Sequence, residues 1–103
     1  MIALPIGNDI VIEWADVRDG RNGNILADAS VAMTLRDSEL QAVPGAESIA
    51  LEAIAEQPGW YQGLLPASLD LHPATYWLDL TATRGGLTGF RRIRCDARHI
   101  GET

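Results

Sequence analysis

The stretch Thr75-Tyr-Trp-Leu-Asp-Leu-Thr-Ala-Thr83 decides the fold class of this chain. Its residues alternate between apolar and mostly polar side chains. Alternation with a period of two, together with many β-branched and aromatic residues, is typical of a half-buried strand. One face is expected to carry Tyr76, Leu78, Leu80 and Ala82, and the other Thr75, Trp77, Asp79, Thr81 and Thr83.

The same alternation occurs on both sides of this stretch. Residues 9–15, 30–36 and 90–97 each predict a strand, and residues 60–65 predict a short aromatic one. Gly85-Gly86 favours a hairpin connection into the last of them. The residues expected to face inward are Ile10, Ile12, Trp14, Val31, Met33, Leu35, Ile93, Cys95 and Ala97.

Residues 46–56, Ala-Glu-Ser-Ile-Ala-Leu-Glu-Ala-Ile-Ala-Glu, are ambiguous. Their Ala, Glu and Leu content favours a helix. Ile49, Leu51, Ala53 and Ala55 nevertheless alternate, the neighbouring segments are strands, and Pro58-Gly59 ends the stretch. We expect a strand here, with a helix as the open alternative.

The sequence therefore predicts six strands, or seven if residues 25–27 or 3–6 also pair. Short strands separated by turn signals, such as Pro44-Gly45, indicate an all-β fold. We expect an immunoglobulin-like antiparallel β-sandwich of six to seven strands. The 103 residues fit one domain, residues 1–103, with a core at about residues 9–97 and short flexible termini.

Several short motifs resemble small immunoglobulin-like phage and prophage structural proteins. They lie at turn and core positions over about residues 9–97, and parts of them also occur in transthyretin-like and other bacterial immunoglobulin-like modules. The resemblance implies a structural role in a particle and brings no catalytic residues with it. The matching segments are Asp28-Ala-Ser-Val31 with Met33, Leu35 and Asp37; Val43-Pro-Gly45; Gly59-Trp-Tyr61 with Gly63 and Pro66; and Tyr76-x-Leu78-x-Leu80.

Composition and charge exclude several function classes. Hydrophobic residues make up 47% of the chain and charged residues 21%, as in a globular protein. The formal net charge of −6, with no lysine, disfavours nucleic acid as a partner, because phosphate binding needs clustered positive charge. No segment reads as a signal peptide or a membrane span, so we expect no membrane partner and a cytoplasmic location, or incorporation into a virion.

Metal-binding patterns are weak. Asp16, Asp19, Asn22, Asn24 and Asp28 carry oxygen ligands of the kind that Ca²⁺ takes from loops. Arg18, however, occupies the place of the second ligand in an EF-hand loop, so a polar turn is the preferred interpretation. His72, His99 and Cys95 are too few and too scattered for a structural zinc site.

Catalytic patterns are weaker still. Cys95 is expected to be a small buried hydrophobic residue, and a Cys-His nucleophile would need His72 or His99 to approach a buried sulfur. No serine has the Gly-x-Ser-x-Gly context, and Gly85-Gly86 with Gly89 lacks the Lys and the helix of a phosphate loop. We therefore expect no enzyme, no cofactor and no small-molecule substrate.

The candidate interface residues are Trp77, Arg91, Arg92 and Arg94. An exposed tryptophan beside arginines is typical of a protein interface. Two other interpretations stay open. The arginines could form a solvated strand face with cross-strand pairs to residues such as Asp79, and a loop or the N-terminal segment could cover Trp77.

These observations favour a non-catalytic structural or assembly component of a phage or prophage particle: a head, connector, tail or decoration module. Its partners are expected to be other phage structural proteins or copies of itself. The alternative is a stand-alone immunoglobulin-like binding or adhesion module that recognises carbohydrate or protein through its loops.

Overall fold

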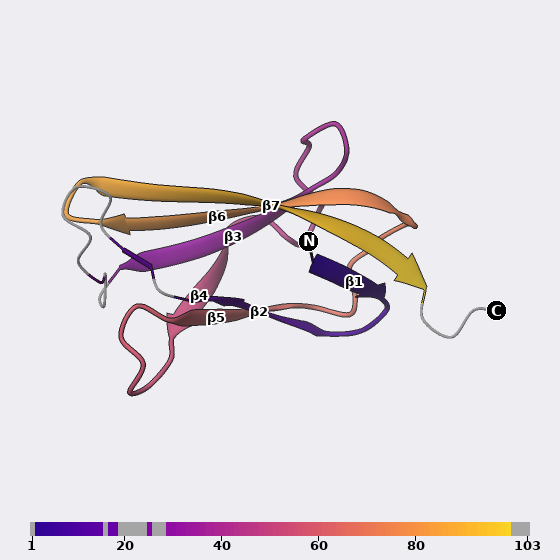
Figure 1. The fold of residues 1–103 in the computed structure, drawn as a ribbon. Coiled ribbons are helices and arrows are strands. Elements are labelled where there is room, and N and C mark those ends of the chain that lie inside the picture. The colour runs from indigo at the N-terminus through magenta and orange to yellow at the C-terminus, as the bar shows by residue number, and fades with distance from the viewer. Residues whose placement is uncertain (1, 16, 19–24, 26–28, 100–103) are drawn as a thin grey trace.

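A computed structural model describes residues 2–15, 17–18, 25 and 29–99, with the backbone alone at residue 87. The described residues form seven strands and no helix (Figure 1), which confirms the all-β prediction and its strand count. No helix of the described part is long and apolar enough to cross a membrane. The strands are β1 (Ile2–Ile6), β2 (Ile10–Trp14), β3 (Ser30–Arg36), β4 (Ile49–Ala53), β5 (Tyr61–Leu65), β6 (Ala74–Arg84) and β7 (Leu87–His99).

The seven strands form one mixed sheet in the order β1-β7-β6-β3-β4-β5-β2. β1 runs parallel to β7, with Ile2 opposite Cys95 and Ile6 opposite His99, whereas the other pairs are antiparallel. The expectation of a purely antiparallel arrangement is therefore wrong. A parallel pair needs a long connection, and here almost the whole chain separates the two strands.

β4 joins the two halves of the sheet. Met33 and Val31 of β3 pair with Ile49 and Leu51 of β4, whereas the last residues of β4, Glu52 and Ala53, pair with β5. The sheet therefore turns at β4, and its overall form is nearly a barrel. In Figure 1, β3, β6 and β7 form an upper layer, and β2, β4 and β5 lie beneath it.

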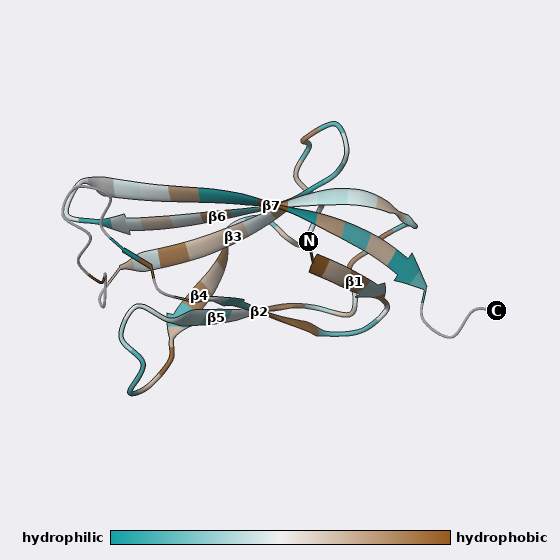
Figure 2. Ribbon diagram, in the orientation of Figure 1, coloured by the Kyte–Doolittle hydropathy of each residue, from teal (hydrophilic) through white to brown (hydrophobic). Residues whose placement is uncertain are grey.

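The core lies between these layers and contains the inward faces expected from the sequence. Alternating hydrophobic and hydrophilic bands are visible along β7 in Figure 2. Two residues expected to face inward, Ile10 and Ile93, are only half-buried. Leu4 of β1 is 1% exposed, so the core begins before residue 9. Fully covered side chains include Leu35, Leu65, Leu78, Leu80 and Cys95.

Two predicted turns are confirmed. Gly85 and Gly86 have φ values of 55° and 83°, as a two-residue hairpin between β6 and β7 requires. At Pro44-Gly45, the amide of Ala46 donates to the carbonyl of Val43 at 2.9 Å, and Gly45 has φ 87°. The ambiguous residues 46–56 contain the strand β4, because Ile49 and Leu51 pair with β3 and the next two residues, Glu52 and Ala53, pair with β5.

The predicted turn at residues 16–24 lies mostly outside the described residues, as do all five candidate calcium ligands between residues 16 and 28. The described positions tie this region to the core. Val17 is 3% exposed, and its amide donates to the carbonyl of Gly59 at 2.8 Å. Arg18 and Ile25 form an isolated antiparallel bridge.

Candidate interaction surface

The outer side of β3, β6 and β7 carries most of the candidate interface residues. Successive residues of a strand point to opposite faces, so the polar positions of all three strands share this side. The strand register places Asp79 between Thr34 and Arg92, and Trp77 between Arg36 and Arg94. We call the group Arg36, Trp77, Phe90, Arg92 and Arg94 the arginine face.

Asp79 lies at the centre of this side and is only 6% exposed. Arg92 donates from Nε to Oδ1 at 2.6 Å and from Nη2 to Oδ2 at 2.9 Å. Arg36 donates from Nε to Oδ2 at 2.8 Å. The two guanidinium groups, from strands on either side, thus cover the carboxylate while their own side chains stay about one-third exposed.

These contacts fix the charge state of the cluster. The hydrogen bond from Arg92 lowers the pKa of Asp79, burial of the carboxyl group opposes this, and the hydrogen bond from Arg36 adds to it. Asp79 in turn raises the pKa of Arg92. One carboxylate shared by two guanidinium groups leaves one positive charge without a partner within the cluster. The predicted cross-strand pairing of Asp79 with the arginines of β7 is confirmed by its contact with Arg92.

Aromatic side chains accompany these charges. Trp77 is half-buried, between the two expected extremes of an exposed and a covered side chain. Phe90 is 60% exposed, and the Arg92 guanidinium lies 5.5 Å from the centroid of its ring. Sequence reasoning did not select Phe90, although its outward position in β7 and its status as the only phenylalanine could have identified it.

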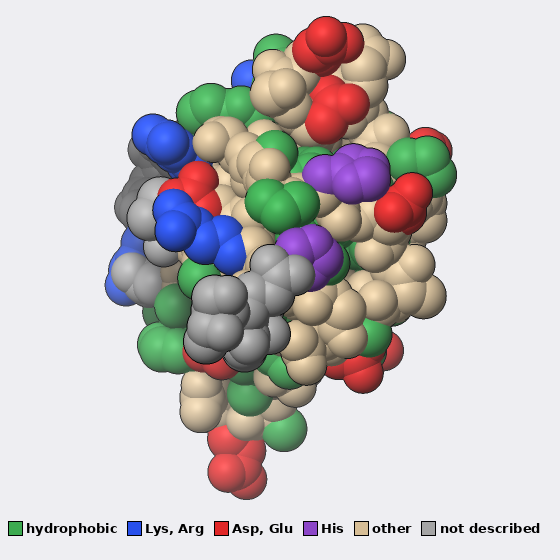
Figure 3. Space-filling model, turned by 90° about the vertical axis from the view of Figure 1, so that its right-hand side faces the viewer, with side chains coloured by type: hydrophobic (Ala, Val, Ile, Leu, Met, Phe, Trp, Pro, Cys, Tyr) green, Lys and Arg blue, Asp and Glu red, His purple; other side chains and the backbone are tan. Residues whose placement is uncertain are grey.

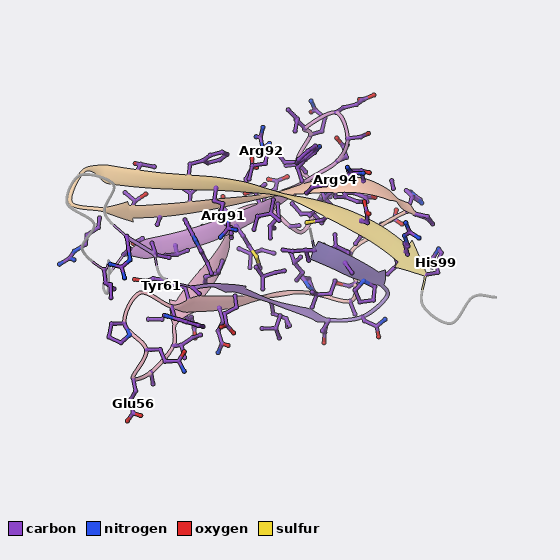
Figure 4. All side chains as sticks on the ribbon, viewed as in Figure 1. Glu56, Tyr61, Arg91, Arg92, Arg94 and His99 are labelled. Atoms are coloured by element: carbon purple, nitrogen blue, oxygen red, sulfur yellow. The ribbon has the colours of Figure 1, made fainter. Side chains whose placement is uncertain are left out.

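Arg91 does not belong to the arginine face. It shares its side of β7 with Ile93 and Cys95 and lies opposite Leu80 in the register. In Figure 4, Arg91 lies below the upper layer, whereas Arg92 and Arg94 lie above it. The structure therefore brings Trp77, Arg92 and Arg94 together and leaves Arg91 apart from them, because neighbouring residues of a strand point in opposite directions.

The candidate nucleophile and metal ligands lie apart from this surface. Cys95 is fully buried, and its burial raises the pKa of the thiol to about 11, so the thiolate is scarce at neutral pH. His99 ends β7, and both histidines are visible at the end of the molecule that faces the viewer in Figure 3. Within the described ranges, no group of three or more His, Cys, Asp or Glu side chains could hold a metal ion.

Comparison with protein-family models, with curated proteins and with solved structures found no match. The arginine face combines guanidinium groups with aromatic rings. Guanidinium groups offer several directed donors to carboxylates, and aromatic rings offer large rigid contact areas. Arg and aromatic residues are also the types enriched in interface centres.

Proposed function

We propose that this chain is a non-catalytic structural or assembly component of a phage or prophage particle and that it works through protein–protein contacts made by the arginine face. The single observation that carries this proposal is the exposed Phe90 beside an arginine cluster with excess positive charge. Such a surface suits an acidic protein partner: another component of the particle or a copy of the chain. The chain then works in the cytoplasm, where particles assemble, and is carried into the virion.

The proposed architecture behind this role is an immunoglobulin-like sandwich. Its support is the strand order, in which β7-β6-β3 forms one layer and β5-β2 lies in the other, with β4 linking them. The motif resemblance to small immunoglobulin-like phage proteins points the same way. In such a domain the two outer faces are free for contacts, because the core occupies the space between the layers.

A second candidate is a stand-alone binding or adhesion module. The observation that favours it is the pair of accessible aromatic side chains, Trp77 and Phe90, on one side of the sheet. Aromatic rings with polar neighbours are suited to binding sugars as well as proteins. Binding of the purified chain to a glycan array, lost in Phe90→Ala, would support this candidate over the first.

The test of the structural role is to express the surrounding prophage region and to look for the chain in purified particles. We expect the wild-type chain to be present and Arg94→Glu to lower its incorporation at least several-fold, because the substitution reverses a charge on the arginine face. Arg84→Glu is the matched control, since Arg84 is exposed at the β6–β7 hairpin and outside that face. It should be incorporated normally.

Two outcomes would defeat this proposal. The first is absence of the chain from particles and assembly intermediates, with a normal particle yield after its gene is deleted. The second is incorporation of Arg94→Glu at the level of the Arg84→Glu control, which would show that the arginine face makes no contact in the particle. The first outcome would favour the second candidate, a stand-alone binding or adhesion module.

A further inference from the structure

The outer side of the lower layer carries a second surface of opposite character. Val11 of β2 is 63% exposed and Leu64 of β5 is 46% exposed, and the two lie opposite each other in the register. Together with neighbours on β4 and β5 they line a hollow of about 350 Å³. We call it the acidic hollow; its lining residues are Val11, Ala50, Glu52, Gln62, Gly63 and Leu64.

The hollow follows from the way the sheet turns. β4 pairs with β5 only through Glu52 and Ala53 and then diverges to pair with β3. Beside Gly63 the two strands still lie close, since an added Cβ there would be 3.0 Å from Leu51 Cγ and 3.1 Å from the carbonyl oxygen of Ala50. The outward residue of β4 at this point is Ala50, whose small side chain leaves the space above it open. A single aromatic side chain is the kind of group that such a hollow can take up.

Charge differs between the two outer sides of the sheet. Among the described residues, the outer side of β3, β6 and β7 carries four arginines, Arg36, Arg92, Arg94 and Arg98, against two aspartates, Asp79 and Asp96. The outer side of β2, β4 and β5 carries Glu13 and Glu52 and no basic residue. Gln62 lies between these two glutamates in the register.

We propose that copies of this chain dock head to tail, with Phe90 of one copy seated in the acidic hollow of the next. Phe90 is the most exposed aromatic side chain of the described residues, and the hollow offers the apolar contacts of Val11 and Leu64. The arginines around Phe90 then face Glu52 and Glu13. The proposal rests on the proposed function, in that the chain acts by docking, and it names the partner as a second copy.

The geometry makes this contact heterologous. The two surfaces lie on opposite layers of the molecule. A row of docked copies therefore has an unoccupied arginine face at one end and an unoccupied acidic hollow at the other. Such a contact closes into a ring or continues as a filament. One inserted ring and a few exposed ion pairs make a weak contact, which becomes effective at the high local concentration inside an assembly.

The experiment is sedimentation velocity over a concentration series up to about 1 mM, in the range where weak contacts are populated. We expect the wild-type chain to associate and Phe90→Asp and Leu64→Asp each to remain monomeric. An equimolar mixture of these two variants should form dimers and stop there, because only one intact Phe90 and one intact hollow remain to meet. Leu40→Asp, at a residue 42% exposed on neither surface, is the control and should associate like wild type.

Three results would overturn the proposal: a wild-type chain that is monomeric throughout the series, a mixture that does not dimerise, and association that survives in Leu64→Asp alone. The last would mean that two arginine faces meet each other. Circular dichroism and thermal melting verify that the variants fold. Particle incorporation reports on the proposed function independently, since a chain that docks only on other proteins would be incorporated without associating with itself.

Discussion

Asp79 shows how one residue sets the character of a whole surface. It lies on the outer side of the sheet, yet Arg36 and Arg92 cover it and bind it through three hydrogen bonds. Without the carboxylate, two guanidinium groups of like charge would face each other across β6. Asp79 therefore holds the two arginines in place.

At pH 7, Asp79→Asn should lower the free energy of unfolding by about 1.5–3 kcal/mol, the range for hydrogen bonds to charged groups. The amide keeps the shape of the side chain but loses the charge that two arginines require. Urea unfolding monitored by tryptophan fluorescence measures the loss. Asp96→Asn is the control: its carboxylate lies 3.9 Å from Arg94 Nε, so its loss should be below about 0.5 kcal/mol. Equal losses in both variants would contradict the assigned role.

The contribution of Asp79 to stability should depend on pH. The folded-state pKa of Asp79 is lowered, so its stabilising contribution is fully present above the ordinary aspartate pKa of about 3.9 and is lost as the pH falls through the folded value. The stability difference between wild type and Asp79→Asn should therefore be constant from pH 7 to about pH 5 and shrink below about pH 4. A difference that stays constant down to pH 2.5 would show that the charge contributes nothing.

Single residues also mark the limit of sequence reasoning. The alternation in residues 75–83 identified the inward face of β6, but the burial of Asp79 depends on the register with β3 and β7, which no local pattern reveals. Arg91 could have been separated from Arg92 and Arg94 by the same alternation. The hollow beside Gly63 could not have been found, because its lining residues come from three strands whose pairing no local pattern reveals.

Among the elements, the β6–β7 hairpin provides the longest ladder and places both Trp77 and Phe90. Its turn needs positive φ at both central residues, and an added Cβ at Gly85 or Gly86 would meet no atom within 4 Å. The requirement for glycine there is thus conformational and not steric. Substitutions at these positions therefore report how much the turn conformation contributes to stability, without a change in side-chain packing.

Gly85→Asn should change the free energy of unfolding by less than about 0.5 kcal/mol, because asparagine tolerates the left-handed region and Asn-Gly is a preferred hairpin pair. Gly85→Val should cost about 1–3 kcal/mol, since a β-branched residue at φ 55° is strained. Thermal and urea unfolding of the two variants provide the comparison. Equal stability of both variants would mean that the turn relaxes to another type and that the ladder alone fixes the hairpin.

The elements were predictable to different degrees. β3 has the predicted bounds of residues 30–36, because its alternation is complete and turns follow it. β7 extends three residues earlier and two later than predicted, since the hairpin and the pairing with β1 prolong it. The parallel pairing of β1 with β7 was not foreseen, because it joins segments at opposite ends of the chain.

The net charge of the whole molecule does not reveal that positive and negative side chains are concentrated on different sides. The chain carries −6, yet arginines exceed carboxylates on the outer side of β3, β6 and β7. Figure 3 shows the same unevenness at one end, where arginine side chains gather on one side and most acidic ones lie elsewhere. A molecule with an acidic side and a basic side can bind copies of itself while its overall charge opposes unspecific association.

The whole domain should also be indifferent to calcium. The segment of residues 16–28 lacks the ligand spacing of a calcium loop, and Val17 near its start is already held by the core and by the carbonyl of Gly59. We expect melting temperatures in EDTA and in Ca²⁺ to agree within about 2 °C, a stability change well under 1 kcal/mol for a domain of this size.

A calcium site in this loop would raise the melting temperature by an easily measured amount. Ligand at one hundred times its dissociation constant stabilises a protein by about 2.7 kcal/mol, which corresponds to roughly 10–20 °C here. Because divalent ions also screen the net negative charge, Mg²⁺ at equal ionic strength is the control. A rise of several degrees with Ca²⁺ but not with Mg²⁺, abolished in Asp16→Asn/Asp19→Asn, would identify a calcium site in the loop and reverse the interpretation of these residues as a polar turn.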